Sequence, residues 1–489
     1  MAYKIQGNPS GPPSGQRPGS LPTPPSGSRP ETASTKPAAD VEIKRPPARL
    51  TSLDAYRGFI MTLLAAGGFG IYGLSRMPAD APVWKLLNRE SFARMAFHFE
   101  HPHDWQSNFL FGPSTDPTEG SPWLRGAVSL WDLIQPSFMF MVGVAMPFSS
   151  LRRRALGEST TRRWLHAVIR AIVLVLLGVF LYSLDSTRTN WIFPNVLAQI
   201  GLGYLFAYAV IDLKWWAQVA VIAVILIGTW IAFFMYSAPE DYDFTAMNAS
   251  PERGEVLEPP FRQWSKNGNI AQEFDVWFLN KFPRPPERDP WVKDDGGYET
   301  LNFVPSIATM ILGVLCGQIL LSGLTPWRKV GRLLLIALVC FILGMAAGAW
   351  ACPIVKRIWT PSWVLFSGGY VVALLTLFYI VFDIAPLKKL AFPLVVVGVN
   401  SILFYLLGQL LRGWVRDKVI HIHFQRAIEA VLGALANAAG WAPKITTDGQ
   451  EAGPAMYAAF APVIDATAVF LVFWIVGYVL YRKRMLLRI

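Results

Sequence analysis

The stretch SLWDLIQPSFMFMVGVAMPFSS, residues 129–150, decides the fold of this chain. At 1.5 Å of rise per residue, a helix of this length crosses the hydrocarbon core of a bilayer. Its first two turns nevertheless carry Asp132, Gln135 and Pro136. An ionisable side chain at that depth is costly unless it faces a polar cavity or a partner. Its second half contains Gly143, which allows a neighbouring helix to come close. We therefore expect a helix with a polar outer end and a tightly packed inner end.

Composition places the whole chain in the same class. Of its 489 residues, 53% are hydrophobic and only 16% are charged, whereas about a quarter are charged in a typical soluble protein. Several apolar runs reach about 20 residues, so the expected fold class is all-α, a polytopic transmembrane helical bundle. A net charge of +11 indicates nucleic-acid binding in many soluble proteins. Here the basic residues gather at helix ends, so membrane topology explains them and no nucleic-acid partner is expected.

Ten transmembrane spans are expected, and basic residues orient them. The spans are placed at 54–74, 129–150, 165–184, 193–211, 215–236, 302–322, 330–350, 362–383, 390–410 and 459–481. By the positive-inside rule, the loop that begins at Arg152 and the basic C-terminal end at Arg482 lie in the cytoplasm. Both termini are therefore expected to be cytoplasmic, in a protein of the cell (inner) membrane. Lys356 and Arg357 are the exception, because they fall on the outer face and need another explanation.

The chain divides into a tail and a membrane domain. Residues 1–48 are rich in Pro, Gly and Ser and are predicted to be a disordered cytoplasmic tail, whereas 49–489 form the transmembrane domain. Three long segments of that domain, 75–128, 237–301 and 411–458, are expected on the extracytoplasmic face. The second is too long for a tight turn, so it should fold as a cap over the bundle or bind something. The third contains an Ala-rich helix that is expected at the membrane interface.

Three histidines crowd the first outer segment, in the sequence FHFEHPHDW. Histidine is the side chain whose ordinary pKa suits proton transfer near neutral pH, so His98, His101 and His103 are candidates for catalysis or binding. Glu100 and Asp104 beside them raise the alternative of a metal site. However, the spacing lacks the helical register of a zinc motif, and no metal is expected. An ordinary polar loop is the remaining interpretation.

Polar groups inside two other spans leave two interpretations each. Asp54 and Arg57 share one face at the cytoplasmic start of the first span. Either they form an ion pair that fixes the helix end, or Arg57 faces a cytoplasmic cavity and receives a phosphate. Asn400 and Ser401 lie within the ninth span. They either hydrogen-bond neighbouring helices or line the channel onto which Asp132 opens.

An unusual aromatic segment, KRIWTPSWVLFSGGY, connects the seventh and eighth spans at residues 356–370. Aromatic faces stack on sugars, and a lysine binds carboxylate or sulfate groups. Lys356, Trp359 and Trp363 are therefore expected to form an anion or sugar site on the outer face.

Together these pieces resemble the heparan-α-glucosaminide N-acetyltransferase family and its uncharacterised bacterial relatives. The matching segments occur in order: RLTSLDAYRGF (49–59), WDLIQPSFMFMVGVAMPFS (131–149), NVLAQIGLGY (195–204), LNFVPSIATMILGVLCG (301–317), KRIWTPSWVLFSGGY (356–370) and GVNSILFY (398–405). The resemblance implies a transmembrane acetyltransferase. Such an enzyme takes acetyl-CoA from the cytoplasm, as a co-substrate, and passes the acetyl group to a sugar amine on the far side.

The resemblance also implies a catalytic histidine between the first span and the helix that begins with WDL. The family has an F-x-H-x-x-W-like context there, and the closest match is His101, with Trp105 one residue late. His103 is the alternative. Asp132 is then expected to orient the imidazole, as the third group does in catalytic triads. Transfer either runs directly or passes through an acetylated histidine.

On the donor side, the resemblance implies that Arg57 and the cytoplasmic arginines meet the CoA phosphates. Asn400 and Ser401 are then expected beside the pantetheine or the thioester. The chain departs from the family pattern in one loop and at two positions. About twenty residues separate Trp105 from Arg125 and Gly126, where the family runs almost directly into the helix. Gly68 stands where the animal enzymes carry an asparagine, and Gln199 stands where the family has the arginine of its L-Q-R-I-G motif.

Two other functions fit the same sequence features. One is a transporter or flippase of a sugar or lipid-linked intermediate, which also uses intramembrane polar groups and broken helices. The other is a non-catalytic membrane protein that docks through segment 237–301. The expected partners are the lipid bilayer, an extracytoplasmic glycan or amino-sugar acceptor and, as an option, a second copy of the chain in a homo-oligomer.

Overall fold

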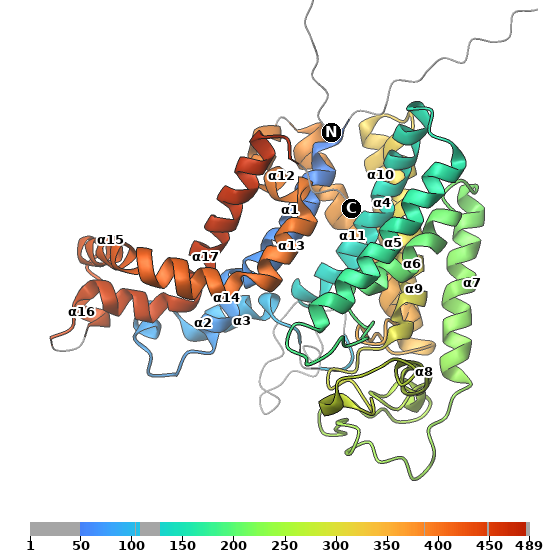
Figure 1. Cartoon of the computed structure of the whole chain (residues 1–489), viewed down its shortest axis with the longest axis horizontal. Coiled ribbons are helices and arrows are strands. Elements are labelled where there is room, and N and C mark those ends of the chain that lie inside the picture. The colour runs from blue at the N-terminus through green and yellow to red at the C-terminus, as the bar shows by residue number, and fades with distance from the viewer. Residues whose placement is uncertain (1–48, 103, 108–127, 386, 447–448, 486–489) are drawn as a thin grey trace, which may run out of the picture. The chain divides into compact units, whose positions relative to one another are not determined.

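The structure is a computed structural model that describes residues 49–102, 104–107, 128–385, 387–446 and 449–485. All of these belong to one compact unit, Arg45–Ile489. The predicted tail, residues 1–48, and the candidate His103 lie outside the described residues. Within the described ranges the regular structure is helical, with no strand, which confirms the all-α class (Figure 1).

Seven helical segments of the described part are long and apolar enough to cross a membrane. Six of the helices that form them are α5 (Thr160–Tyr182), α7 (Trp215–Phe234), α9 (Phe303–Leu321), α10 (Pro326–Trp350), α11 (Pro361–Tyr379) and α17 (Ala452–Arg482). The seventh is α4 (Ile134–Ala155), which continues from the short turn η5 (Trp131–Leu133). Together η5 and α4 contain residues 131–150 of the stretch that predicts a polar outer end and a packed inner end.

The other three expected spans take different forms. Helices α1 (Thr51–Ala65) and α2 (Ile71–Ser75) form a pair bent by 50°, and α12 (Phe392–Val399) and α13 (Ser401–Leu410) form a pair bent by 66°. Helix α6 (Val196–Ala209) has only 14 residues, about 21 Å, which is shorter than a bilayer core. The described residues therefore support seven spans, or up to nine if each bent pair is one span.

The break after α1 has a defined cause. Residues Gly67–Gly70 (η1) have four consecutive positive φ angles, of 56°, 60°, 55° and 67°. Glycine adopts this left-handed conformation without the penalty that a Cβ atom imposes, and three of the four residues are glycines. Arg412 then donates a hydrogen bond of 2.7 Å to the carbonyl of Leu64, which satisfies part of the free end of α1.

Glycines bring α4 into direct backbone contact with α9. A Cβ atom on Gly143 would lie 1.9 Å from the carbonyl oxygen of Met310, and one on Gly313 would lie 2.1 Å from that of Phe140. No larger residue fits at either position without moving a helix. The close approach predicted at Gly143 is therefore confirmed.

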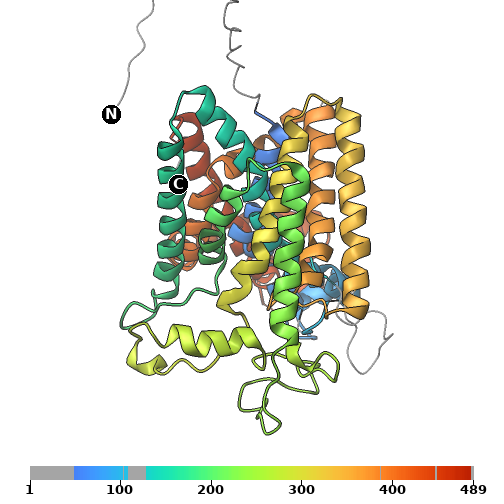
Figure 2. The same cartoon turned by 90° about the vertical axis from the view of Figure 1, so that its right-hand side faces the viewer.

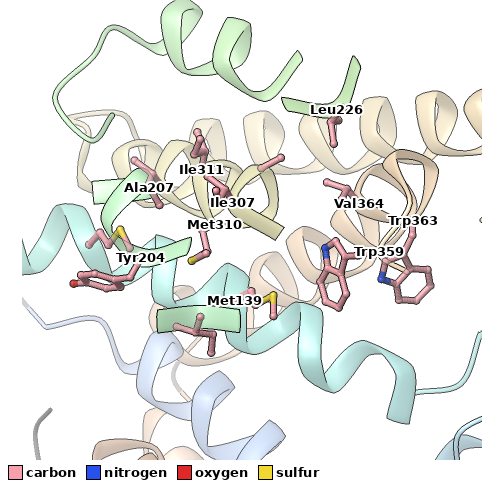
Figure 3. Packing of buried hydrophobic residues seen from close by; sticks show 14 of the residues in the cluster. Met139, Tyr204, Ala207, Leu226, Ile307, Met310, Ile311, Trp359, Trp363 and Val364 are labelled. Carbon is pink, nitrogen blue, oxygen red and sulfur yellow. The ribbon is translucent and has the colours of Figure 1, made fainter. Parts of the chain in front are cut away.

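The largest apolar cluster lies between α4, α6, α7, α9 and the start of α11. Met139, Tyr204 and Met310 belong to it, and so do Trp359 and Trp363 (Figure 3). Burial of such large side chains is the main stabilising contribution in this part of the chain. The cluster packs α4 firmly, so the outer end of this helix is a rigid platform.

The second outer segment folds around α8 (Ile270–Leu279), which lies across the ends of α7 and α9 in both views (Figures 1 and 2). Trp264 from this segment packs with Trp105 of the first outer segment and with Val355, which precedes α11. The indole of Trp105 also donates a hydrogen bond of 2.9 Å to the Trp264 carbonyl. The segment thus forms a cap that joins the first outer segment to the loop before α11.

The third outer segment is also helical. It contains η11 (Val415–Phe424), α15 (Gln425–Ala438) and α16 (Ala442–Ile445). Helix α15 packs along α17 and runs across the direction of α10 in Figure 1. The last long helix begins at Ala452, earlier than the predicted residue 459, because its first turns pack against α15.

Candidate functional site

The outer end of α4 brings together a lysine, a carboxylate and a histidine from three distant parts of the chain. Asp132 lies in η5, His101 lies in the first outer segment, and Lys356 lies in the loop between α10 and α11. The ammonium nitrogen of Lys356 is 2.9 Å from Asp132 Oδ1 and 2.9 Å from His101 Nδ1. His101 Nδ1 lies 3.3 Å from the same Oδ1 atom of Asp132. The polar partner predicted for Asp132 is thus provided by these two side chains.

The three side chains differ in their exposure. Asp132 and Lys356 are 4% and 5% exposed, whereas the side chain of His101 is 50% exposed. Two opposite charges that are buried together compensate each other, while either one alone would be costly at this depth. The ion pair therefore forms a fixed base, and the imidazole is the part of the cluster that another molecule can reach.

Local hydrogen bonds fix the histidine segment to the start of α4. Ser129 Oγ accepts a bond of 3.1 Å from the Asp132 amide and donates one of 2.8 Å to the Glu100 carbonyl. The ring of Trp131 meets that of His101 edge-on, with 6.3 Å between the ring centroids. One serine thus caps the helix start and positions the residue that precedes His101.

The loop before α11 folds so that its lysine and its tryptophans separate. Thr360 Oγ1 accepts hydrogen bonds from the amides of Val355 and Trp363, at 3.0 and 3.3 Å, and thereby caps α11. Trp359 and Trp363 are then 1% and 0% exposed, in the large apolar cluster. The sequence predicted an exposed sugar or anion site at these two residues and Lys356. In this structure a sugar does not reach either ring, and Asp132 binds the lysine.

Arg357, the second outer cation, connects the cap to the histidine segment. Its guanidinium donates hydrogen bonds of 3.3 Å to the carbonyls of Pro102 and Gly296. Its own carbonyl accepts a bond of 2.6 Å from Asn302. The sequence grouped Arg357 with Lys356 as cations of an anion or sugar site, because both break the expected positive-inside pattern. In this structure the guanidinium binds backbone carbonyls instead.

The surroundings of His101 favour its neutral form. Burial lowers the pKa of its imidazole, the charge of Lys356 lowers it further, and the bond to Asp132 opposes both. The shorter contact on Nδ1 is the one from Lys356, and an ammonium group only donates, so in this structure Nδ1 carries the lone pair and the proton lies on Nε2. In the second tautomer Nδ1–H faces Asp132 and Nε2 carries the lone pair, and this requires the Lys356 ammonium to move off Nδ1. Only the second tautomer makes Nε2 a base or a nucleophile.

The residues at which the chain departs from the family pattern have structural explanations. Gly68 has a φ of 60°, and a Cβ atom there would lie 3.1 Å from the ring of Phe99 and 3.3 Å from that of Trp131. A larger residue is therefore disfavoured. Gln199 is buried, accepts a hydrogen bond of 2.7 Å from Gln135 and donates one of 3.0 Å to the Asn302 carbonyl.

At the opposite end of α4 lies a basic cavity of about 440 Å³. Helices α4, α5 and α6 line it, and its basic residues are Arg153, Arg163, Arg170 and the histidine His166. Arg153 is paired with Glu158. In contrast, the Nε atoms of Arg163 and Arg170 are buried and have no hydrogen-bond partner among the described residues. Such guanidinium groups are suited to bind a phosphate.

Arg57 lies near this cavity rather than in a simple ion pair. Asp54 forms its ion pair with Arg49, with 2.5 Å between the atoms. The interpretation in which Asp54 pairs with Arg57 is therefore wrong. The Nε atom of Arg57 is buried without a partner in the described part of the chain. The charges that act on Arg57 are, largest first, those of Asp54, Arg170 and Arg49, and Arg57 itself is not among the residues that line the cavity. The alternative in which Arg57 receives a phosphate stays a prediction.

Asn400 and Ser401 lie at the break between α12 and α13. The backbone of Asn400, with φ −120° and ψ 36°, ends α12, and its side chain is fully buried. Ser401 is the first residue of α13. Neither residue lines the basic cavity. Among the described residues, no group of three or more His, Cys, Asp or Glu side chains is arranged to hold a metal ion.

The charge of Lys356 should be measurable at the histidine. We predict that Lys356→Met raises the pKa of His101, because it removes a positive charge 2.9 Å from Nδ1. Diethyl pyrocarbonate modifies the neutral imidazole, so the midpoint of His101 modification, followed by peptide mass spectrometry, should move to higher pH. Lys266→Met, which breaks another buried ion pair in the cap, is the control and should leave this midpoint unchanged. An unchanged midpoint in the Lys356 variant would contradict the proximity of the two groups.

Comparison with known proteins identifies one related family. The family model for heparan-alpha-glucosaminide N-acetyltransferase, catalytic, matches residues 118–253. This segment contains Asp132 and all the residues that line the basic cavity, but neither His101 nor Lys356. No curated protein matches the chain. Residues 118–253 are thus similar to the catalytic domain of this acetyltransferase family, which confirms the resemblance predicted from the sequence.

Proposed function

We propose that this protein is a membrane acyltransferase that moves an acetyl group from cytoplasmic acetyl-CoA to an extracytoplasmic sugar amine or related glycan acceptor. The observation that carries the proposal is the pair of sites on α4. A histidine held by a buried ion pair lies at one end of this helix, and a phosphate-sized basic cavity lies at the other. The family match supports a membrane N-acetyltransferase.

The donor would enter through the basic cavity. Acetyl-CoA carries its phosphates at one end and its thioester at the other. If Arg163 and Arg170 bind the phosphates, the pantetheine arm would have to extend along α4 toward Asp132. Met146, which lines the cavity, is 14 residues from Asp132, or about 21 Å along the helix. Binding at the arginines therefore sets the direction in which the thioester points.

The chemistry uses the tautomer in which His101 Nδ1–H faces Asp132, which forms when the Lys356 ammonium moves off Nδ1 and stays on Asp132. In direct transfer, Nε2 removes a proton from the acceptor amine as its nitrogen attacks the thioester carbonyl carbon. The C–S bond then breaks, and CoA leaves as a thiolate that takes up a proton. Asp132 stabilises the imidazolium, and Lys356 keeps the resting imidazole neutral. In the alternative route, Nε2 itself attacks the thioester, and the acceptor amine then removes the acetyl group from the histidine.

A transporter or flippase remains the second candidate. The two bent helix pairs favour it, because carriers often place substrate sites at interrupted helices. The two functions differ in the product. A carrier moves an unmodified molecule, whereas the acyltransferase forms an amide bond.

Sealed vesicles test the proposal. With labelled acetyl-CoA trapped on the cytoplasmic side and glucosamine outside, we predict labelled N-acetylglucosamine in the outer solution. His101→Ala should lower the rate by about 10²–10⁴-fold, the usual contribution of a general base. His423→Ala, at an exposed histidine, should leave it unchanged. Uptake of glucosamine without acetylation would favour the carrier, and full activity of the His101 variant would exclude the mechanism.

The donor site has a separate test. We predict that Arg170→Gln raises the KM for acetyl-CoA by about 10-fold or more, since a charge-assisted hydrogen bond contributes about 1.5–3 kcal/mol. The KM for S-acetylpantetheine, which lacks the phosphates of CoA, should not change. Arg332→Gln, at an exposed arginine of α10, is the control. If Arg170→Gln raised the KM for acetyl-CoA and the KM for S-acetylpantetheine equally, phosphate binding in this cavity would be contradicted.

A further inference from the structure

A buried pair of carboxyl groups in the cap takes no part in the proposed chemistry. Asp275 lies in α8, and Glu299 directly precedes the turn η8 (Thr300–Asn302) that leads into α9. Both residues are 0% exposed. The amide of Thr300 donates a hydrogen bond of 2.8 Å to Asp275 Oδ2. Asp275 Oδ1, both carboxyl oxygens of Glu299 and the nearby Thr300 hydroxyl have no hydrogen-bond partner of good geometry among the described residues.

The charges around this pair are negative. Those that act on Glu299 come from Asp275 and Asp294, and no cation is among them in the described part of the molecule. Glu299 also acts on Tyr242, and Asp294 in turn interacts with Asp295 and Tyr182. The cations that contact the same segment are Arg357, which binds the Gly296 carbonyl, and Lys266, which lies beside Gly297 and is paired with Glu255. Two ionised carboxylates side by side, buried and without a cation, would be strongly unfavourable. Burial and these neighbours raise the pKa of Asp275 to about 6 and that of Glu299 well above its ordinary value.

A third carboxylate of the cap provides a contrast. Glu255 is also buried, but its two oxygens accept hydrogen bonds from the Lys266 ammonium, at 2.9 Å, and from the Ser250 amide, at 2.8 Å. Burial alone would raise its pKa, yet the bonds from Ser250 and Lys266 bring the pKa of Glu255 below its ordinary value. The pKa of Glu255 is therefore lowered and that of Glu299 is raised, although both are buried in the cap, because only Glu255 has hydrogen-bond donors.

We propose that Glu299 is held as a neutral carboxylic acid that donates its proton to Asp275 Oδ1, and that this shared proton positions the histidine segment. With the proton in place, Asp275 Oδ1 and Oδ2 are both bonded, and residues 294–302 are fixed against α8. The shared proton rests on the burial of both groups, on their unsatisfied oxygens and on the direct interaction between the two carboxyl groups. The positioning role rests in addition on the proposed function of His101.

A short chain of hydrogen bonds connects the pair to the candidate site. The Asn302 amide donates to the Glu299 carbonyl at 3.3 Å, and the Asn302 side chain donates to the Arg357 carbonyl at 2.6 Å. The Arg357 guanidinium in turn binds the carbonyls of Gly296 and Pro102, the residue after His101. Loss of the proton would place two negative charges together and loosen residues 294–302. Glu299 is thus a positioning residue that acts through Arg357.

The pH dependence has a definite sign. A carboxyl group whose pKa is raised by folding stabilises the folded state fully below its ordinary range, about 4, and loses this contribution as the pH rises through the folded value. For the pair, the loss begins above about pH 4, where both carboxyl groups ionise in the unfolded chain. Asp275 ionises near pH 6 in the folded protein and then accepts the proton of Glu299, and the loss continues at higher pH for as long as Glu299 keeps that proton. The pH dependence from Glu255 has the opposite sign, because its pKa is lowered by folding, so it stabilises the fold only above its unfolded pKa.

The first test compares two glutamine variants by their unfolding temperature between pH 4.5 and 8.5. Glutamine has the shape of a neutral carboxylic acid and still donates a hydrogen bond. Glu299→Gln should therefore match the unaltered protein at pH 5 within about 1–2 °C. Its unfolding temperature should also fall less steeply between pH 5 and pH 8 than that of the unaltered protein. Glu255→Gln, the matched control, should be destabilised throughout. If Glu299→Gln is instead destabilised at pH 5 as strongly as Glu255→Gln, Glu299 is ionised and the proposal is overturned.

The second test addresses positioning. Glu299→Ala should lower kcat without changing the KM for acetyl-CoA, and Glu299→Gln should restore kcat and make it less sensitive to rising pH. Equal kcat–pH profiles for the unaltered, Ala and Gln proteins would overturn the positioning role. If the unaltered protein transfers no acetyl group, the proposed function fails, while the unfolding temperatures still decide whether the proton is shared. Diethyl pyrocarbonate modification of His101 then measures positioning, and unchanged modification in Glu299→Ala would overturn it.

Discussion

The buried ion pair between Asp132 and Lys356 is the interaction on which the rest of the outer face depends. It allows a carboxylate to begin an otherwise apolar helix, since neither charge would be tolerated there alone. It also joins the start of α4 to the loop before α11, two parts of the chain that are 224 residues apart. His101 lies on this pair, which fixes its position, while burial and the charge of Lys356 together favour its neutral form. The hydrogen bonds of Ser129 and Arg357 then fix the segment that carries it.

Helix α4 relates the two candidate sites to each other. Its outer end carries the ion pair, its middle contacts α9 through Gly143 and Gly313, and its inner end lines the basic cavity. Because the backbones of α4 and α9 touch, the helix is held rigidly between the two ends. A rigid connection of this kind suits a reaction in which one molecule is bound at the inner end and consumed at the outer end. The same rigidity would limit a carrier, which has to alternate between two conformations.

The sequence predicted those features that local patterns determine. The lengths of the apolar runs located the long helices, and Gly143 predicted a close neighbour. Asp132 predicted a polar partner at the outer end of its helix. Other features depend on contacts between distant residues. The breaks at Gly67–Gly70 and Asn400 were missed because hydropathy does not register a bend in an apolar run. Trp359 and Trp363 were expected at the surface, but the sequence of a loop does not determine which way its rings turn.

Charge partners were the least predictable part of the site. Asp54 binds Arg49 rather than the residue on its own helix face, and Lys356 binds Asp132 rather than a ligand. The protonation of Glu299 is equally invisible in the sequence, because it follows from the absence of donors around a buried group. What the sequence did provide was the resemblance to an acetyltransferase family. The structure adds the geometry of a histidine, a carboxylate and a lysine.

The central claim is that Asp132 and Lys356 stabilise each other and together hold the outer site. A double-mutant cycle of unfolding free energies, with Asp132→Asn and Lys356→Met in mixed detergent micelles, tests it most directly. We expect each single variant to lose about 3–5 kcal/mol, because a buried charge is left unpaired. The double variant should then lose less than the sum, by about 1–3 kcal/mol. Losses that simply add would contradict the claim, since they would mean that the two side chains do not depend on each other.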